Sequence, residues 1–187
     1  MLRMHMEELF PVVPTTTVEA LEIFDSADPV DPEFMFGTWH GAELPTGHLL
    51  DGLLAATGWW GKQFVNAETV HPLLFPTRDG SALWAFNPVL AFSILGPATK
   101  LPALKRRSFL GQLNTLQPLL RTRSPRARLR TTRYRGVDSA TMVYDQAPVN
   151  DVFRRLSDDA VIGAMDLRGS AWPYFFVLYR DESLKLI

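Results

Sequence analysis

The sequence contains no cysteine, and it lacks the motifs of the common nucleotide-dependent and hydrolytic enzymes. The absence of cysteine excludes a disulfide framework, thiol catalysis and any cysteine-ligated zinc or iron–sulfur site. No Gly-x-Gly-x-x-Gly, phosphate loop, Gly-x-Ser-x-Gly or His-Glu-x-x-His pattern occurs, so nucleotide-dependent chemistry and the common hydrolase mechanisms have no support. The aromatic strand motifs of RNA-binding domains are also missing.

Long apolar runs are missing as well. No stretch reaches the roughly 18 apolar residues that a transmembrane helix needs. The first eight residues carry one arginine and two acids and have no apolar segment of a signal peptide. We therefore expect a soluble cytoplasmic protein.

The composition is that of a globular domain, with 187 residues, of which 47% are hydrophobic and 21% charged, and a net charge of −1. The charge is unevenly divided: residues 1–100 carry 4 basic and 12 acidic side chains, and residues 101–187 carry 15 basic and 8 acidic ones. Residues 121–135 form an arginine-rich segment. We favour the interpretation that this segment forms solvated strand faces beside the acidic first half, over contact with an anionic lipid or nucleic acid.

Hydrophobic periodicity predicts many short strands and a few helices. Helical patterns cover residues 15–27, with Thr17 as the N-cap, and residues 48–57 and 151–156. The apolar stretch 87–102 is rich in proline and glycine and is expected to form a loop. Strand patterns cover residues 34–43, 59–66, 70–75, 81–86, 108–120, 126–135, 139–145, 160–166 and 172–179.

Many short, evenly spaced strands favour a mostly β fold: a closed antiparallel barrel of about 8–10 strands with two or three short helices. Closure removes the unpaired edges that an open sheet would expose. A barrel of this size can hold one small ligand. Alternation within residues 126–135 places Arg133 and Arg135 on the apolar side, so the strand either contains a bulge or points these arginines inward.

His48 and Asp51 are the candidate catalytic residues. They stand three positions apart on a predicted helix and therefore share one face. A carboxylate beside an imidazole stabilises its protonated form and fixes its tautomer, which suits a general base or a proton shuttle. The alternative is that the pair only caps and charges the first helical turn.

Further candidates are expected to bind a ligand. Trp39 stands between two glycines and is expected either to plug one end of the barrel or to touch the ligand. His40, Trp59 and Trp60 lie nearby, and Lys62 is either a buried amine or a cation paired with an acid. The second half of the chain adds four more candidates: Arg133, Tyr144, Asp145 and Asp166.

Residues 37–41, Gly-Thr-Trp-His-Gly, resemble the signature of the bacterial and fungal GXWXG-motif family. The segments at residues 44–48, 59–62 and 71–75 resemble the continuation of that signature. The resemblance implies a small lipocalin-like barrel whose biochemical role is not established for the family.

The second half is similar to the C-terminal companion domain of unknown function in that family. The matching segments are Ser-Ala-Thr-Met-Val-Tyr-Asp at residues 139–145 and Gly-Ala-Met-Asp at 163–166. The resemblance implies one barrel domain over residues 1–187, made of a GXWXG segment at 20–80 and a companion segment at 124–181.

A more distant likeness to nitrobindins and fatty-acid-binding barrels raises the question of haem. Haem binding in nitrobindins needs a further glycine-rich run after the motif and a histidine late in the chain. Here Ala42 and Glu43 follow the motif, and no histidine follows His71, so haem is disfavoured and no cofactor is predicted. His40, His48 and His71 match no recognised ligand spacing, so no metal site is predicted.

These observations favour the binding of a small hydrophobic or aromatic molecule in the barrel interior. The alternative is a cofactor-independent isomerase, cyclase or hydratase in which His48 and Asp51 move a proton. A monomer or a homodimer is expected.

Overall fold

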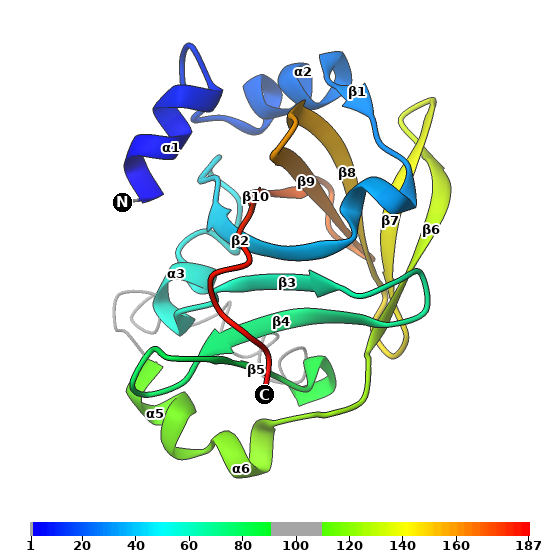
Figure 1. Cartoon of the computed structure of the whole chain (residues 1–187). Helices are drawn as coiled ribbons and strands as arrows, with labels where there is room; N and C mark the ends of the chain where they lie inside the picture. Colours follow the sequence, from blue (N-terminus) through cyan, green and yellow to red (C-terminus); the bar gives the residue numbers. More distant parts are fainter. Residues whose placement is uncertain (1, 91–109) are drawn as a thin grey trace.

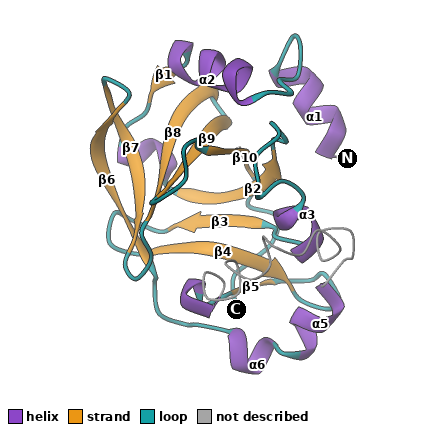
Figure 2. Ribbon diagram, turned by 180° about the vertical axis from the view of Figure 1, so that it is seen from behind, coloured by secondary structure: helices purple, strands orange, loops and turns teal. Residues whose placement is uncertain are grey.

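The computed structural model describes residues 2–90 and 110–187 and consists of a closed antiparallel barrel flanked by short helices (Figures 1 and 2). The ring runs in the order β8, β7, β6, β4, β3, β2, β10 and β9, and β9 pairs back with β8. The expected closed antiparallel barrel is therefore confirmed. Its ring strands are β2 (Gly37–Glu43), β3 (Gly61–Phe64), β4 (Val70–Pro76), β6 (Ala127–Tyr134), β7 (Val137–Tyr144), β8 (Val149–Ser157), β9 (Ala160–Leu167) and β10 (Tyr174–Arg180).

Two further strands lie beside the ring: β1 (Asp28–Pro29) pairs with β8, and β5 (Leu83–Ala85) pairs with β4. The named helices of the described residues are α1 (Leu2–Leu9), α2 (Thr17–Ser26), the 3-10 helix η1 (Pro32–Met35), α3 (Leu53–Thr57), α5 (Leu110–Thr115) and α6 (Gln117–Leu120). The expected N-cap of α2 is off by one residue. Thr16 is the cap, and it forms a capping box with Glu19.

Alternate side chains of the ring strands point to opposite sides of the wall. The inward set forms a core rich in aromatic residues, which includes Trp39, Phe64, Phe153 and Phe176. Outside the ring, α2 covers β8, β9 and β10, where its apolar face packs against the outward residues of these strands (Figure 1). Both sides of this wall are therefore buried.

Two glycines bring aromatic rings close to the inner wall. A Cβ on Gly41 would overlap the ring of Trp59, and a Cβ on Gly163 would overlap the ring of Phe176. Because glycine has no side chain, both rings lie directly against the backbone. The last glycine of the Gly-x-Trp-x-Gly motif thus positions an aromatic side chain of the interior.

The prediction of a helix at residues 151–156 is wrong, because this segment belongs to β8. The strand pairs with β9 from Val149 to Ser157 and with β7 over a shorter stretch. Its outward residues Val152 and Arg154 are buried beneath α2 while Phe153 is buried inside. Burial on both faces removes the simple apolar–polar alternation that identifies a half-exposed strand.

Two other predictions also differ from the structure. The strand expected at 108–120 is replaced over its described residues by α5 and α6. The helix expected at 48–57 begins only at Leu53, after Gly52 in a left-handed conformation, and it ends at Gly58 as its C-cap. The loop predicted at 87–102 lies mostly outside the described residues.

Candidate functional site

A buried ion pair lies inside the barrel. Lys62 on β3 and Asp151 on β8 place Nζ and Oδ2 2.8 Å apart, and the two side chains are only 3% and 1% exposed. The Lys62 ammonium also donates a hydrogen bond to the carbonyl oxygen of Pro72 at 3.2 Å. Burying a charge costs free energy unless it is paired and hydrogen-bonded, and both conditions are met for Lys62.

Aromatic rings surround the ammonium group. Nζ of Lys62 lies 5.4 Å from the ring centroid of Trp59, 5.8 Å from that of Tyr144 and 5.0 Å from that of Phe176. The negative faces of such rings attract a cation. The Tyr144 hydroxyl oxygen also accepts a hydrogen bond from Nζ at 3.5 Å. The ion pair is thus enclosed by groups that stabilise its positive member.

Burial shifts the pKa values of the two acidic groups beside Lys62 upward. Burial raises the pKa of the Asp151 carboxyl, and the nearby Lys62 ammonium offsets part of that rise. Burial also raises the pKa of the Tyr144 phenol well above its usual value, and the negative charge of Asp151 adds to the effect. Tyr144 is therefore a neutral hydroxyl group at physiological pH.

Two polar atoms beside this pair have no hydrogen-bond partner within the described part of the chain. One is Oδ1 of Asp151, which is an acceptor, and the other is Nε1 of Trp59, which is a donor. A buried polar atom without a partner costs about 1–3 kcal/mol. The interior thus holds one acceptor and one donor near the same ammonium group.

Trp39 is anchored in the interior by its indole N–H group and by a cation. Its side chain is fully buried, and its Nε1 donates a hydrogen bond to the carbonyl oxygen of Met35 at 2.7 Å. The Arg180 guanidinium lies 4.3 Å from the Trp39 ring and donates hydrogen bonds to the carbonyl oxygens of Phe34 and Phe36. These contacts fix the Trp39 ring within the aromatic core.

His48 and Asp51 lie in the same turn, where the backbone amide of Asp51 donates a hydrogen bond to the carbonyl oxygen of His48 at 3.0 Å. Both residues precede α3, in a turn region rather than on the predicted helix. Oδ2 of Asp51 accepts hydrogen bonds from the backbone amides of Thr46 and Gly47. The His48 ring accepts from the Leu50 amide at Nδ1 and lies 3.2 Å from Oγ of Ser170 at Nε2.

His40 and Trp60 lie outside the ring. Their rings stack with centroids 4.7 Å apart, and Nδ1 of His40 lies 3.7 Å from a carboxylate oxygen of Asp181. Trp60 belongs to an outer apolar cluster that also contains Leu74 and Leu83. Adjacent tryptophans of the sequence therefore have different surroundings, since Trp59 lies inside the barrel.

The remaining sequence candidates of the second half, apart from Tyr144, lie at the surface. Arg133 is 73% exposed and faces Asp138, Asp145 pairs with Arg128 at 2.8 Å, and Asp166 is exposed. The pairing of β6 with β7 is continuous, so the strand contains no bulge, and Arg133 is exposed although it keeps the parity of the apolar side, because it lies next to the end of β6.

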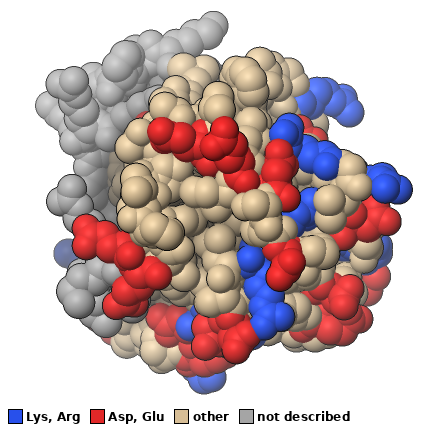
Figure 3. Space-filling model, turned by 90° about the horizontal axis from the view of Figure 1, so that it is seen from above, with Lys and Arg blue, Asp and Glu red and all other residues tan. Residues whose placement is uncertain are grey.

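Several arginines of the 121–135 segment face carboxylates. Arg130 pairs with Glu68 at 2.8 Å, and Arg135, in the turn after β6, pairs with Asp25 at 2.6 Å. Figure 3 shows basic and acidic side chains side by side on one face of the molecule. This arrangement supports the interpretation that the segment lies beside the acidic first half of the chain.

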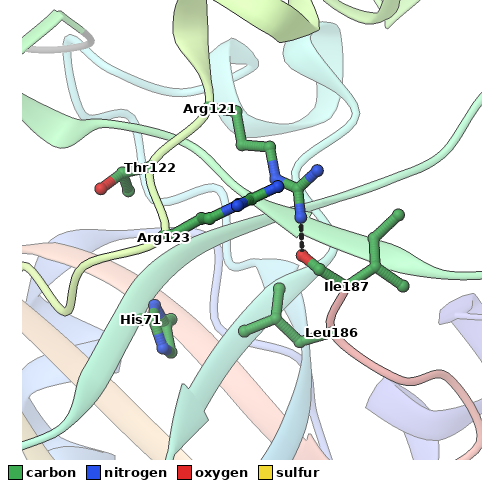
Figure 4. Close-up of a pocket in the computed structure, with 6 residues that line it drawn as sticks. All are labelled: His71, Arg121, Thr122, Arg123, Leu186 and Ile187. Carbon is green, nitrogen blue, oxygen red and sulfur yellow. Dashed lines mark hydrogen bonds between the residues drawn. The ribbon is translucent and has the colours of Figure 1, made fainter.

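A separate pocket of about 310 Å³ lies on the outer side of β4 (Figure 4). His71 lines it from β4, opposite Arg121 and Arg123, and Arg121 donates a hydrogen bond to the backbone oxygen of Ile187. Burial lowers the pKa of His71, which favours its neutral form. Leu186 and Ile187 of the C-terminal segment complete the apolar side of the pocket.

No group of three or more His, Asp or Glu side chains suited to a metal ion occurs among residues 2–90 and 110–187. Over the same residues, no helix has both the length and the apolar character needed to cross a membrane.

Sequence reasoning missed Asp151, because it assigned this residue to a helix. The useful signal was the alternation of Val149, Asp151 and Phe153, which share one side of a strand. A lysine predicted to lie inside an apolar barrel also requires an acidic partner. Lys62, Trp59 and Tyr144 were candidates from the sequence, and Asp151, which pairs with Lys62, was not.

Comparisons with known proteins match both halves of the chain. The GXWXG protein family matches residues 22–80, and a domain of unknown function, DUF4334, matches residues 125–180. Together these segments contain every strand of the closed ring. A crystal structure of a protein from Thermomonospora curvata has 31% sequence identity and a TM-score of 0.65, and the match covers 88% of this chain and 86% of that one. No curated protein matches the sequence.

Substitutions at the buried ion pair should show strong coupling. Lys62→Met or Asp151→Leu alone leaves one buried charge without its partner and should lower the free energy of unfolding by about 3–5 kcal/mol. The double variant removes both charges and should be more stable than either single variant. Urea unfolding measures all three proteins.

Arg133→Ala provides the matched control, because it breaks an exposed ion pair, and it should cost less than about 1 kcal/mol. Losses at Lys62 and Asp151 that simply add in the double variant would contradict a coupled pair.

Proposed function

We propose that this chain, which belongs to the GXWXG protein family and carries its DUF4334 companion domain, binds a small hydrophobic or aromatic molecule inside the barrel. The observation that carries the proposal is the unpartnered donor and acceptor beside Lys62, within an interior otherwise lined by apolar and aromatic groups. Binding sites for small molecules typically combine an apolar lining with a few polar groups of this kind.

The energetics suit a ligand of modest size. Eight-stranded barrels are wide enough to hold one small ligand. Burial of about 200 Å² of apolar ligand surface contributes roughly 5 kcal/mol, before the cost of association is subtracted. Trp59 and Phe176 would supply flat faces for an aromatic ligand, and their rings already meet edge to face at 5.9 Å.

A titration with N-phenyl-1-naphthylamine, a neutral apolar fluorophore, tests the proposal. We expect a saturable rise in fluorescence with one site per chain and micromolar affinity. Met142→Trp adds bulk opposite Asp151 in the strand register and should weaken binding at least about tenfold, because it fills the space that the ligand needs.

Arg133→Ala is the surface control and should leave the affinity unchanged, with folding of both variants checked by circular dichroism. A signal that never saturates, or one that falls in the Arg133 variant and not in the Met142 variant, would contradict binding in the interior.

A second candidate function is proton transfer by a cofactor-independent isomerase, cyclase or hydratase. The observation in its favour is the buried Asp151 carboxyl, whose pKa is raised and whose Oδ1 has no partner among the described residues. A carboxylate with a raised pKa is a stronger base than an exposed carboxylate with an ordinary pKa. In this version of the hypothesis, Asp151 takes the role that the sequence suggested for His48 and Asp51.

Deuterium exchange into 2-tetralone, followed by proton NMR in D₂O, tests this second candidate. The Asp151 carboxylate would take a proton from C1 to give the enolate, and a deuteron from the solvent would then replace it. Exchange should rise with pH through the raised pKa of Asp151, because only the ionised carboxyl accepts a proton. Asp151→Asn should abolish the acceleration, whereas loss of activity in His48→Ala and not in Asp151→Asn would contradict the assignment.

A further inference from the structure

Building on the proposed function, we infer that the interior site selects a neutral apolar molecule that carries a hydroxyl group, an alcohol or a phenol, over carboxylates and over hydrocarbons. The hydroxyl group would donate to Oδ1 of Asp151 and accept from Nε1 of Trp59, which are two of the buried polar atoms without partners among the described residues. This inference depends on ligand binding in the barrel and adds the chemical class of the ligand.

The charge balance of the site argues against a carboxylate. The Lys62 ammonium is already neutralised by Asp151 at 2.8 Å, so the pair carries no net charge. A ligand carboxylate would also meet the unpartnered oxygen of Asp151, and two like charges at close range repel each other. Burial of this uncompensated charge would add a desolvation cost.

Arg180, a second cation among the described residues that contacts an interior aromatic ring, is already engaged. Its guanidinium donates to the carbonyl oxygens of Phe34 and Phe36, and Nε lies 3.5 Å from a carboxylate oxygen of Asp159. Neither cation therefore offers a ligand carboxylate an unneutralised charge.

The hydrogen-bonding pattern argues for a hydroxyl group in particular. A hydrocarbon satisfies neither Oδ1 of Asp151 nor Nε1 of Trp59, and an ether or a ketone can only accept from the indole. A hydroxyl group is both a donor and an acceptor and can satisfy both atoms at once. Because each unsatisfied buried group is costly, we expect a hydroxyl group to raise the affinity by about 10- to 100-fold over a hydrogen atom at the same place.

Three probes with the same ring system test the inference at pH 7: 1-naphthol, naphthalene and 1-naphthoate, each measured by displacement of N-phenyl-1-naphthylamine. We expect 1-naphthol to bind at least about tenfold more tightly than naphthalene, and 1-naphthoate to bind more weakly than both. Equal affinities for 1-naphthol and naphthalene would overturn the inference and leave apolar binding intact. Absence of binding by every probe, including the fluorophore itself, would overturn the proposed function as well.

Matched variants show whether the preference comes from Asp151. Asp151→Asn removes the negative charge and leaves the Lys62 ammonium unneutralised, so the preference should shift toward 1-naphthoate. Asp145→Asn is the same chemical change at an exposed ion pair and should leave the order of the three probes unchanged.

The double variant Lys62→Met/Asp151→Leu provides a second test if Asp151→Asn does not fold. This variant should bind naphthalene and should no longer bind 1-naphthol more tightly than naphthalene. A preference for 1-naphthol that persists in this variant would overturn the inference.

Discussion

The ion pair between Lys62 and Asp151 is the interaction on which this account of the barrel depends. It joins β3 of the GXWXG segment to β8 of the companion segment across the interior, with both side chains almost fully buried. A charge in such a place is tolerated only while its partner is present. The pair therefore links the two segments of the ring and introduces polar groups into an otherwise apolar core.

The same pair determines which chemistry the interior supports. Its net charge is zero, its surroundings are aromatic, and it leaves an acceptor at Asp151 and a donor at Trp59 that bind nothing else in the described chain. Gly41 and Gly163 contribute indirectly, because they let Trp59 and Phe176 lie against the wall. The last glycine of the family motif, Gly41, thus bears on the site through packing.

The closed barrel could be predicted from the spacing of short strands and turns, since that pattern reflects local alternation along single strands. Trp59, Lys62 and Tyr144 could be placed in a candidate site for the same reason. Asp151 could not be placed in the site from the sequence. It lies on β8, which is buried on both faces and therefore lacks the alternation of apolar and polar residues that marks a half-exposed strand. The helix expected to carry His48 and Asp51 also failed as a prediction at these residues, because Gly52 adopts a left-handed conformation and the helix starts only after it. Long-range strand pairing decided the case of Asp151 and leaves little trace in local sequence, whereas the backbone conformation of Gly52 decided the start of the helix.

The most direct test of the central claim is the indole N–H signal of Trp59 in protein labelled with ¹⁵N-tryptophan, assigned with the Trp59→Phe variant and followed by NMR as 1-naphthol is added. The N–H groups of Trp39 and Trp84 already donate to carbonyl oxygens of Met35 and Pro76 and serve as internal references. A neutral hydroxyl ligand held by Trp59 and Asp151 predicts a saturable downfield shift of the Trp59 signal, with the two reference signals little changed. A Trp59 signal that does not move at saturating 1-naphthol would contradict the account.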